Sequence, residues 1–299
     1  MRLNKLTLRD KKKFDKYLAI EKHALSVYAL ANIYIWRKFF DIRWALIKGS
    51  LCVFFQDKIG AFLYLSPLSK ENEPEVVKEV FKILDSLNKN TEFSHLENIE
   101  QEDAGFYKDL GLECIFKSYD YICERGDLAG LIGSRFKSKR ASCNFFAKHN
   151  DFSFQPLSLK DKNGCFKLYN LWAKQRNAGH PDHIYQGMLA DSLVSLKEAF
   201  ANYANLGFQG WIVKIGKEVK GFTFGFPLNA DTFCVLYEIT DLSIKGLAQF
   251  IFRAFAEELK NYKYINIMDD SGLENLKRVK LSYHPEKLVP AYIVRRALT

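Results

Sequence analysis

The residues best suited to chemistry lie near the carboxyl end of the chain. An apolar run ends at Asn266, the acids Asp269 and Asp270 follow, and the segment Lys280–Pro285 comes shortly after. Polar groups at the end of a strand usually face a ligand, because such loops carry chemistry on a rigid scaffold. A structural interpretation is equally open, in which the acids cap the following helix and Pro285 ends it.

Glu238 is the second candidate. It lies near the end of the apolar run Phe233–Ile239, beside a turn that leads into a long amphipathic segment. Transfer of an acyl group to an amine or a hydroxyl needs a base that takes the acceptor's proton. We therefore predict that Glu238 acts as this base or anchors the amine of the donor. The alternative is a surface carboxylate on an edge strand.

The turn after Glu238 is similar to a phosphate-binding loop. Gly246 and Ala248 stand where the next helix begins, and small residues there let backbone N–H groups meet a phosphate or a carboxylate. Gcn5-related acyltransferases carry a basic residue or Gln, two residues, Gly, one residue and then Gly or Ala at this turn. Here Ser243 replaces the first of these. The alternative is an ordinary turn that needs glycine for its backbone geometry.

A basic segment lies in the middle of the chain. Four positive charges fall within six positions, at Arg135, Lys137, Lys139 and Arg140. Such a segment could hold a phosphate backbone. We predict that Lys139 and Arg140, together with Lys280, neutralise the phosphates of a donor. A solvated helix between two domains is the alternative.

No motif for metal or nucleotide chemistry stands out. His180 and His183 lie three apart beside a proline, with no further ligands near them in the sequence, so we predict no metal site. The six cysteines form no C-x-x-C pair and are expected to be reduced thiols. No G-x-S-x-G, Walker A or G-x-G-x-x-G sequence occurs, which removes support for hydrolase, NTPase and Rossmann functions.

The composition indicates a folded, basic protein. Hydrophobic residues make up 48% of the 299 residues, which is ample for a core, and the formal net charge is +9. A basic surface favours polyanionic partners, such as tRNA, anionic lipid or the pyrophosphate of CoA. Since no signal peptide and no run of about 18 apolar residues occurs, we expect a cytoplasmic protein without a transmembrane segment, as a monomer or a small homo-oligomer.

The elements that would position these residues occur twice along the chain. Each half shows a hairpin followed by a strand, a helix, a strand, a helix and a last strand. The run Ile59–Leu68 also parallels Val219–Leu228 in sequence. This pattern predicts an α/β protein with mixed sheets and two related domains, at residues 1–133 and 153–299, joined by the basic interdomain segment 134–152.

The chain resembles a bacterial family, that of the phosphatidylglycerol lysyltransferase C-terminal domain, over roughly residues 20–296. Four segments carry the resemblance, and the last is the most specific. They are Asp127–Gly133 with Phe136, Lys139, Arg140 and Asn144; Gly221–Gly225; Glu238 with Ile244–Leu247; and Asn266 with Asp270, Gly272, Leu273, Leu276 and Lys280–Pro285.

This resemblance implies a tandem pair of Gcn5-related N-acyltransferase-like domains. The best-understood members of the family move an aminoacyl group from aminoacyl-tRNA to the glycerol headgroup of a lipid. They also carry a membrane-spanning half, which this sequence lacks, so a stand-alone relative is expected. Two positions depart from the family, since Cys143 stands where histidine is common and Met268 where an acid is common. If those positions bind substrate, the substrate of this protein differs.

These features together predict an enzyme that transfers an aminoacyl group from aminoacyl-tRNA, or an acyl group from acyl-CoA, to an amine or hydroxyl of a small molecule or lipid headgroup. No nucleophile paired with a base is visible, so direct transfer is the simplest scheme, and no tightly bound cofactor is expected. The predicted catalytic residues, all in the C-terminal domain, are Glu238, Asp270 and Tyr283, with Tyr283 as proton donor. The predicted binding residues are Lys139, Arg140, Gly246, Ala248, Asn266, Lys280, Ser282 and His284. The alternative is a non-catalytic module that keeps the fold and binds RNA or protein through its basic segment.

Overall fold

The computed structural model of the protein describes residues 2–178 and 183–297. The chain forms two compact units, and each combines segments that are distant in the sequence. Unit 1 consists of Met1–Tyr121, Asp269–Lys277 and Leu288–Thr299, and unit 2 of Ile122–Met268 and Arg278–Lys287.

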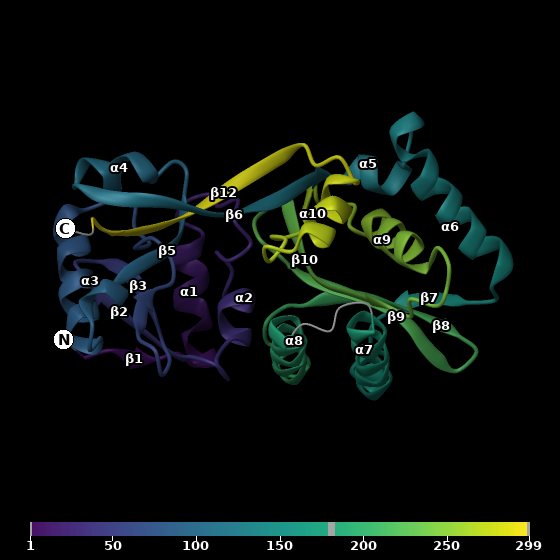
Figure 1. Ribbon diagram of the computed structural model, residues 1–299, viewed down its shortest axis with the longest axis horizontal. Helices are drawn as coiled ribbons and strands as arrows, with labels where there is room; N and C mark the ends of the chain where they lie inside the picture. Colours follow the sequence, from purple (N-terminus) through teal and green to yellow (C-terminus); the bar gives the residue numbers. More distant parts are fainter. Residues whose placement is uncertain (1, 179–182, 298–299) are drawn as a thin grey trace. The chain divides into compact units, whose positions relative to one another are not determined.

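Unit 1 is a mainly antiparallel sheet accompanied by helices (Figure 1). Its strands follow the order β1-β2-β3-β4-β5-β12, and only β4 and β5 among the paired strands described run parallel. The strands are β1 Asn4–Lys5, β2 Asp41–Ile47, β3 Ser50–Gln56, β4 Ala61–Leu63, β5 His95–Glu100 and β12 Lys287–Arg296. The helices are α1 Lys11–Leu18, α2 Leu30–Ile35, α3 Pro74–Leu87 and α4 Ala104–Asp109.

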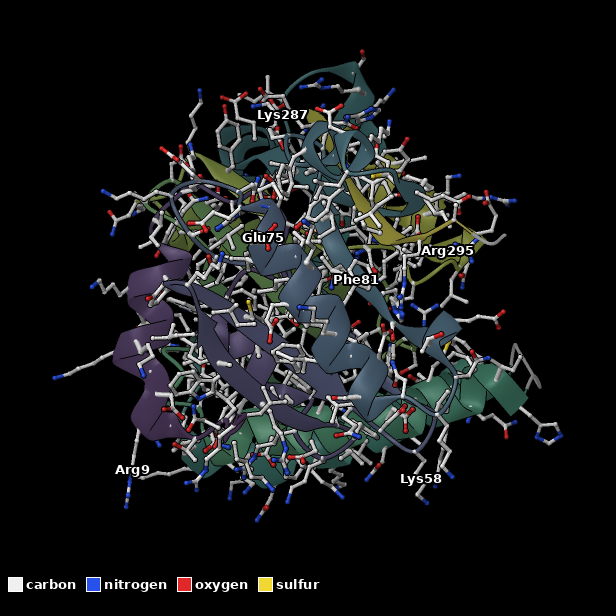
Figure 2. All side chains as sticks on the ribbon, turned by 90° about the vertical axis from the view of Figure 1, so that its left-hand side faces the viewer. Arg9, Lys58, Glu75, Phe81, Lys287 and Arg295 are labelled. Atoms are coloured by element: carbon white, nitrogen blue, oxygen red, sulfur yellow. The ribbon has the colours of Figure 1, made fainter. Side chains whose placement is uncertain are left out.

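Helix α3 builds the core of unit 1 against the sheet. Pro74 occupies its first turn, where the missing N–H of proline leaves no helical hydrogen bond unmade. Buried apolar residues then recur at Val76, Val80 and Leu84, which is the spacing of a single helix face. Figure 2 views this unit end-on and labels Phe81 on the same helix. Full burial of each such side chain contributes about 1.5–3 kcal/mol, so this face holds helix and sheet together.

The segment before α2 is a loop, although its sequence pattern predicts helices over residues 8–22 and 23–40. The backbone amides of Ala24 and Leu25 donate to the carboxylate of Glu100 on β5, at 2.8 and 3.0 Å. A side chain that accepts from backbone N–H groups competes with the helical hydrogen bonds. The long-range contact with Glu100 therefore replaces the helix that the local pattern favours.

Unit 2 is a mixed sheet with helices on both faces (Figure 1). Its strands follow the order β6-β11-β10-β9-β8-β7, with β10 and β11 parallel and the other pairs antiparallel. The strands are β6 Leu112–Glu124, β7 Ser153–Pro156, β8 Gln209–Ile215, β9 Glu218–Pro227, β10 Thr232–Thr240 and β11 Tyr264–Asn266. Only the last residues of β6, from Ile122, belong to this unit.

The helices of unit 2 divide between the two faces of the sheet. One face carries α5 Arg125–Gly130, α6 Lys137–His149 and α9 Leu247–Glu258, and the other carries α7 Lys162–Asn177 and α8 His183–Ala201. A short helix, α10 Glu274–Leu281, precedes β12. The predicted α/β class with mixed sheets is confirmed. No helix in the described part of the chain is both long and apolar enough to cross a membrane.

The compact units differ from the predicted domains, since residues 122–152 lie in unit 2 and residues 269–277 and 288–299 lie in unit 1. The segment 134–152 lies inside unit 2, where α6 packs against α9, and does not link the units. The last strand, β12, belongs mostly to unit 1 and pairs there with β5, so that Ala291 lies opposite Glu100. Local sequence patterns reveal a strand but not its partner, which is why the exchange was not predicted.

Candidate active site on strand β10

A β-bulge determines which way Glu238 points. On β10 the register with β9 shifts between Val235 and Tyr237, so one extra residue enters the strand. Side chains alternate along a strand, and the extra residue reverses that alternation. Tyr237 therefore faces α8, where its hydroxyl donates to the carbonyl of Ser192 at 2.9 Å. Glu238, the next residue, points to the opposite face, which carries α6 and α9.

Glu238 also lies beyond the paired part of two parallel strands. The pairing of β10 with β11 runs from Thr232 and Tyr264 to Cys234 and Asn266, and Glu238 follows further along β10. The carboxyl ends of parallel strands meet at one edge of a sheet, and α/β folds bind their ligands at this edge. The fold therefore presents the Glu238 carboxylate where a ligand is expected.

Lys139, Ser282 and Tyr283 form a cluster on this face. The ammonium group of Lys139 lies 3.9 Å from the centre of the Tyr283 ring and donates to the Ser282 hydroxyl at 2.6 Å. The Tyr283 ring packs edge-on against Phe252 of α9, with ring centres 4.7 Å apart. A cation over an aromatic face gains about 0.5–2 kcal/mol. These contacts fix the ammonium group in one position.

The electrostatics of this cluster suit proton transfer. Burial raises the pKa of Glu238 to about 8, although the ammonium groups of Lys139 and Lys280 act in the opposite direction. Burial lowers the pKa of Lys139, and burial together with the charge of Glu238 raises the pKa of Tyr283. The Glu238 carboxylate has no hydrogen-bond or ion-pair partner among the described residues. A carboxyl group with so strong a shift beside a cation is typical of a catalytic acid or base.

Asn266 and Lys280 support the end of β11. The side-chain oxygen of Asn266 accepts from the backbone N–H of Met268 at 2.7 Å, and the ammonium group of Lys280 donates to the carbonyl of Ile267. Met268 has a φ of 61°, in the left-handed region, so these two bonds stabilise a backbone conformation that costs free energy. Both predicted binding residues therefore form hydrogen bonds with the backbone. Lys280 also lies close enough to lower the pKa of Glu238.

The turn before α9 already holds an anion, the carboxylate of Asp241. Its Oδ1 accepts from the Ser243 N–H at 3.1 Å, from the Ser243 hydroxyl at 2.6 Å and from the Gln175 side chain at 3.0 Å. Its Oδ2 lies 3.3 Å from the ammonium group of Lys220. Although burial acts in the opposite direction, these donors lower the pKa of Asp241 to about 2. The N–H and hydroxyl groups of Ser243 thus bind a carboxylate of the chain itself.

Gly246 is explained by helix packing. Its φ of 82° is left-handed, and a Cβ atom at this position would lie 2.1 Å from the carbonyl oxygen of Ser142 on α6. Only glycine allows the backbones of α6 and the start of α9 to approach this closely. Ala248 lies half-buried in the first turn of α9. The glycine that suggested a phosphate loop therefore has a structural role in this fold.

Arg140 and His284 make local contacts. The guanidinium group of Arg140 donates to the carbonyls of Leu131 and Gly133, and so closes the loop between α5 and α6. The exposed ring of His284 lies edge-on to Phe136, with ring centres 5.3 Å apart. Each of these predicted binding residues thus contributes to the scaffold around α6.

Asp270 belongs to unit 1, whereas Glu238 and Tyr283 belong to unit 2. Its carboxylate accepts from the Tyr121 hydroxyl and, at 2.9 Å, from the backbone N–H of Gly272. The second bond is the turn-forming contact that a structural interpretation of the paired acids predicts. The catalytic role of Asp270 stays a prediction.

The structure joins Lys139, Ser282 and Tyr283 by direct contacts. The charges of Lys139 and Lys280 act on Glu238, and that of Glu238 acts on Tyr283. Sequence reasoning missed that Asp241 fills the turn before α9. The signal was present, because an Asp two residues before a Ser in a turn favours a side chain that bonds its own backbone. No group of three or more metal-binding side chains occurs among residues 2–178 and 183–297, and His180 lies outside the described residues.

Comparison with known proteins supports the family resemblance. The family described as "Phosphatidylglycerol lysyltransferase, C-terminal" matches residues 19–295 of the chain. No curated protein matches the chain. Among solved structures, a conserved protein of unknown function from Bacteroides thetaiotaomicron is 24% identical, with a TM-score of 0.88 over 98% of this chain and 99% of that one.

Two further structures show how widely the fold is shared. L-PGS from Bacillus licheniformis is 16% identical, with a TM-score of 0.67 over 96% of this chain and 92% of that one. FemX is 9% identical, with a TM-score of 0.64 over 98% and 97%. At these identities the likeness establishes the fold, and it extends over both units.

Proposed function

This protein belongs to the phosphatidylglycerol lysyltransferase C-terminal domain family, and on that premise we propose that it transfers an aminoacyl group from aminoacyl-tRNA to an amine or hydroxyl acceptor. The observation that carries the proposal is the Glu238 carboxylate, which lacks a hydrogen-bonding partner among the described residues, has a pKa near 8 and shares its face of the sheet with Lys139 and Tyr283. A structural carboxylate would be paired, because burying an unpaired charge is costly.

The residues suit a direct transfer. Glu238 takes the proton of the acceptor as the acceptor attacks the acyl carbon of the donor ester. The Lys139 ammonium group stabilises the negative charge that develops on the ester. When the bond between the acyl carbon and the leaving oxygen breaks, that oxygen takes a proton from Tyr283, whose raised pKa keeps its hydroxyl protonated. The proton held by Glu238 then returns to Tyr283, and both groups are restored.

The turn before α9 favours aminoacyl-tRNA over acyl-CoA as the donor. A CoA pyrophosphate would need the N–H groups of that turn, and Asp241 already occupies the Ser243 N–H with a carboxylate that stays ionised above pH 2. A pyrophosphate in that turn would also meet the negative charge of the Asp241 carboxylate, and like charges repel. A tRNA donor needs no phosphate in this turn, and the net charge of +9 suits its polyanionic backbone.

The test uses charged tRNAs with a labelled amino acid, an extract of cellular lipids and small metabolites, and three forms of the protein. We expect the native chain to transfer label and Glu238→Gln to lose about 100-fold or more of the rate. Glu258→Gln, which changes an exposed carboxylate on α9, is the matched control and should keep full activity. Equal rates for the native chain and Glu238→Gln, or transfer from acyl-CoA alone, would contradict the proposal.

A non-catalytic role remains the second candidate, because α6 exposes Lys137 and Lys148 beside the site. An RNA-binding module would lose RNA affinity in the double variant Lys137→Ala and Lys148→Ala. It would be indifferent to Glu238→Gln. The two candidates therefore separate in the same set of variants.

A further inference from the structure

A cavity in unit 2 is lined by residues of helix α7, of the turn before it and of the hairpin of β8 and β9. Figure 1 labels these elements. The volume of the cavity is about 380 Å³. Five of the side chains that line it are lysines, and two are acids. The lysines are Lys160, Lys167, Lys214, Lys217 and Lys220. This cavity lies on the α7 face of the sheet, whereas Glu238 points to the α9 face, so the two are separate sites.

The acids of the cavity are already paired with lysines. Asp161 lies 2.6 Å from the ammonium group of Lys214. Glu218 lies 3.0 Å from that of Lys220 and 3.7 Å from that of Lys167. These two carboxylates engage three of the five lysines, and Lys220 also pairs with Asp241 at 3.3 Å, so the lysines still outnumber the acids that hold them.

Lys160 and Lys217 supply this excess. Neither has an acidic partner among the described residues, and both are exposed at the rim of the cavity. Because both line one cavity, their like charges repel one another. An anion in the cavity would relieve that repulsion.

The floor of the cavity is partly apolar and closely packed. Leu168 is buried, and Val219 lies so close to Gly164 that a Cβ there would be 2.8 Å from a Val219 methyl group. The side chains of Lys214 and Lys220 are only 24% and 23% exposed, so their charges act in a medium that screens them less than bulk water does. A concave site with an apolar floor and a few convergent charges is typical of a small-ligand site.

We propose that this cavity binds a compact polyanion that carries phosphate groups, with diphosphate as the smallest member of the class. Phosphate oxygens would meet Lys160 and Lys217 at the rim, and Lys220, which pairs with Glu218 and Asp241, would add its charge from inside the cavity. A ligand that carries only carboxylates is less suited, because the carboxylates of Glu218 and Asp161 already pair with lysines of the cavity. The proposal does not depend on the chemistry at Glu238.

The test measures the binding of inorganic pyrophosphate to the full chain by calorimetry at constant ionic strength. We expect a Kd of about 1 mM or tighter. The double variant Lys160→Ala and Lys217→Ala should bind at least about tenfold more weakly. The matched control, Lys58→Ala with Lys89→Ala, removes the same charge from exposed sites in unit 1 and should bind as the native chain does (Figure 2 labels Lys58).

A third variant tests the competition inside the cavity. Glu218→Gln removes the carboxylate that Lys167 and Lys220 now pair with, so pyrophosphate should bind about two- to fivefold more tightly. Competition by a short RNA identifies the phosphate as part of a nucleic acid, and lack of competition identifies a free ligand. No measurable binding to the native chain, or equal loss in both double variants, overturns the proposal.

Discussion

Replacing Glu238 by Gln should make the protein more stable, and increasingly so as the pH rises. The native carboxyl has a pKa of about 8, whereas an unperturbed glutamate has 4.5. Between these values the unfolded chain carries the charge and the folded chain carries the proton. Folding must then bind a proton from solution, so the native chain loses stability as the pH rises through this window. Glutamine carries no charge and escapes the loss.

The size of the effect follows from the pKa values. Each pKa unit corresponds to about 1.4 kcal/mol, so the penalty approaches about 5 kcal/mol above pH 8. Because Glu238 interacts with Lys139 and Lys280, we expect Glu238→Gln to raise the free energy of unfolding by about 3–5 kcal/mol. Below pH 4.5 the difference between the two proteins should disappear, because both states of the native chain then hold the proton.

Urea unfolding of both proteins at pH 4.5, 6, 7.5 and 9 measures this difference directly. Glu258→Gln serves as the control, since its carboxylate is exposed and should give a difference near zero at every pH. A pH-independent difference between Glu238→Gln and the native chain would refute the reasoning, because it would mean that Glu238 keeps an ordinary pKa. The expected gain in stability with loss of transfer is the usual sign of a residue kept for function.

Three other changes test the surroundings of the site. Lys139→Met removes a charge that lowers the pKa of Glu238. In the pH profile of transfer, the group that must lose its proton should therefore titrate at higher pH than in the native chain. An unchanged profile would show that Lys139 does not act on Glu238. Gly246→Ala places a Cβ against the Ser142 carbonyl and should cost about 3 kcal/mol or more of unfolding free energy, measured by urea titration, whereas a loss below about 1 kcal/mol would show that α6 can move away. Asp241→Ala removes the anion from the turn and should cost about 1–3 kcal/mol at pH 7. Since the pKa of Asp241 is lowered, that cost should shrink as the pH falls from 4 towards 2, and a constant cost would contradict the assignment.

The sequence predicted the fold class and singled out Glu238 as a candidate, because both depend on local patterns; the role of Glu238 stays a prediction. An apolar run that ends in a carboxylate beside a turn is visible in a single strand. What it could not show was the bulge between Val235 and Tyr237, which turns Glu238 towards α9. A bulge depends on how β10 pairs with β9, and no residue of β10 by itself indicates it.

The same limit explains the roles of Arg140, Asn266 and Lys280. Each is polar and is predicted to meet a substrate, and the fold shows that each also bonds to backbone carbonyl or amide groups. Those groups lie at places where a helix or strand ends, and such ends leave backbone groups unsatisfied. A sequence shows where polar side chains stand, whereas only the fold shows which backbone groups require them.

The return of β12 to unit 1 has a consequence for biosynthesis. Its pairing with β5 is made by residues 291–295, which leave the ribosome after all of unit 2. Until then β5 has one edge of backbone groups without this partner, and exposed strand edges promote aggregation. Unit 2 in turn takes Ile122–Glu124 from the strand that begins in unit 1. Unit 1 can therefore be completed only after unit 2 has been synthesised, and fragments cut at 152 would lack strands on both sides of the cut.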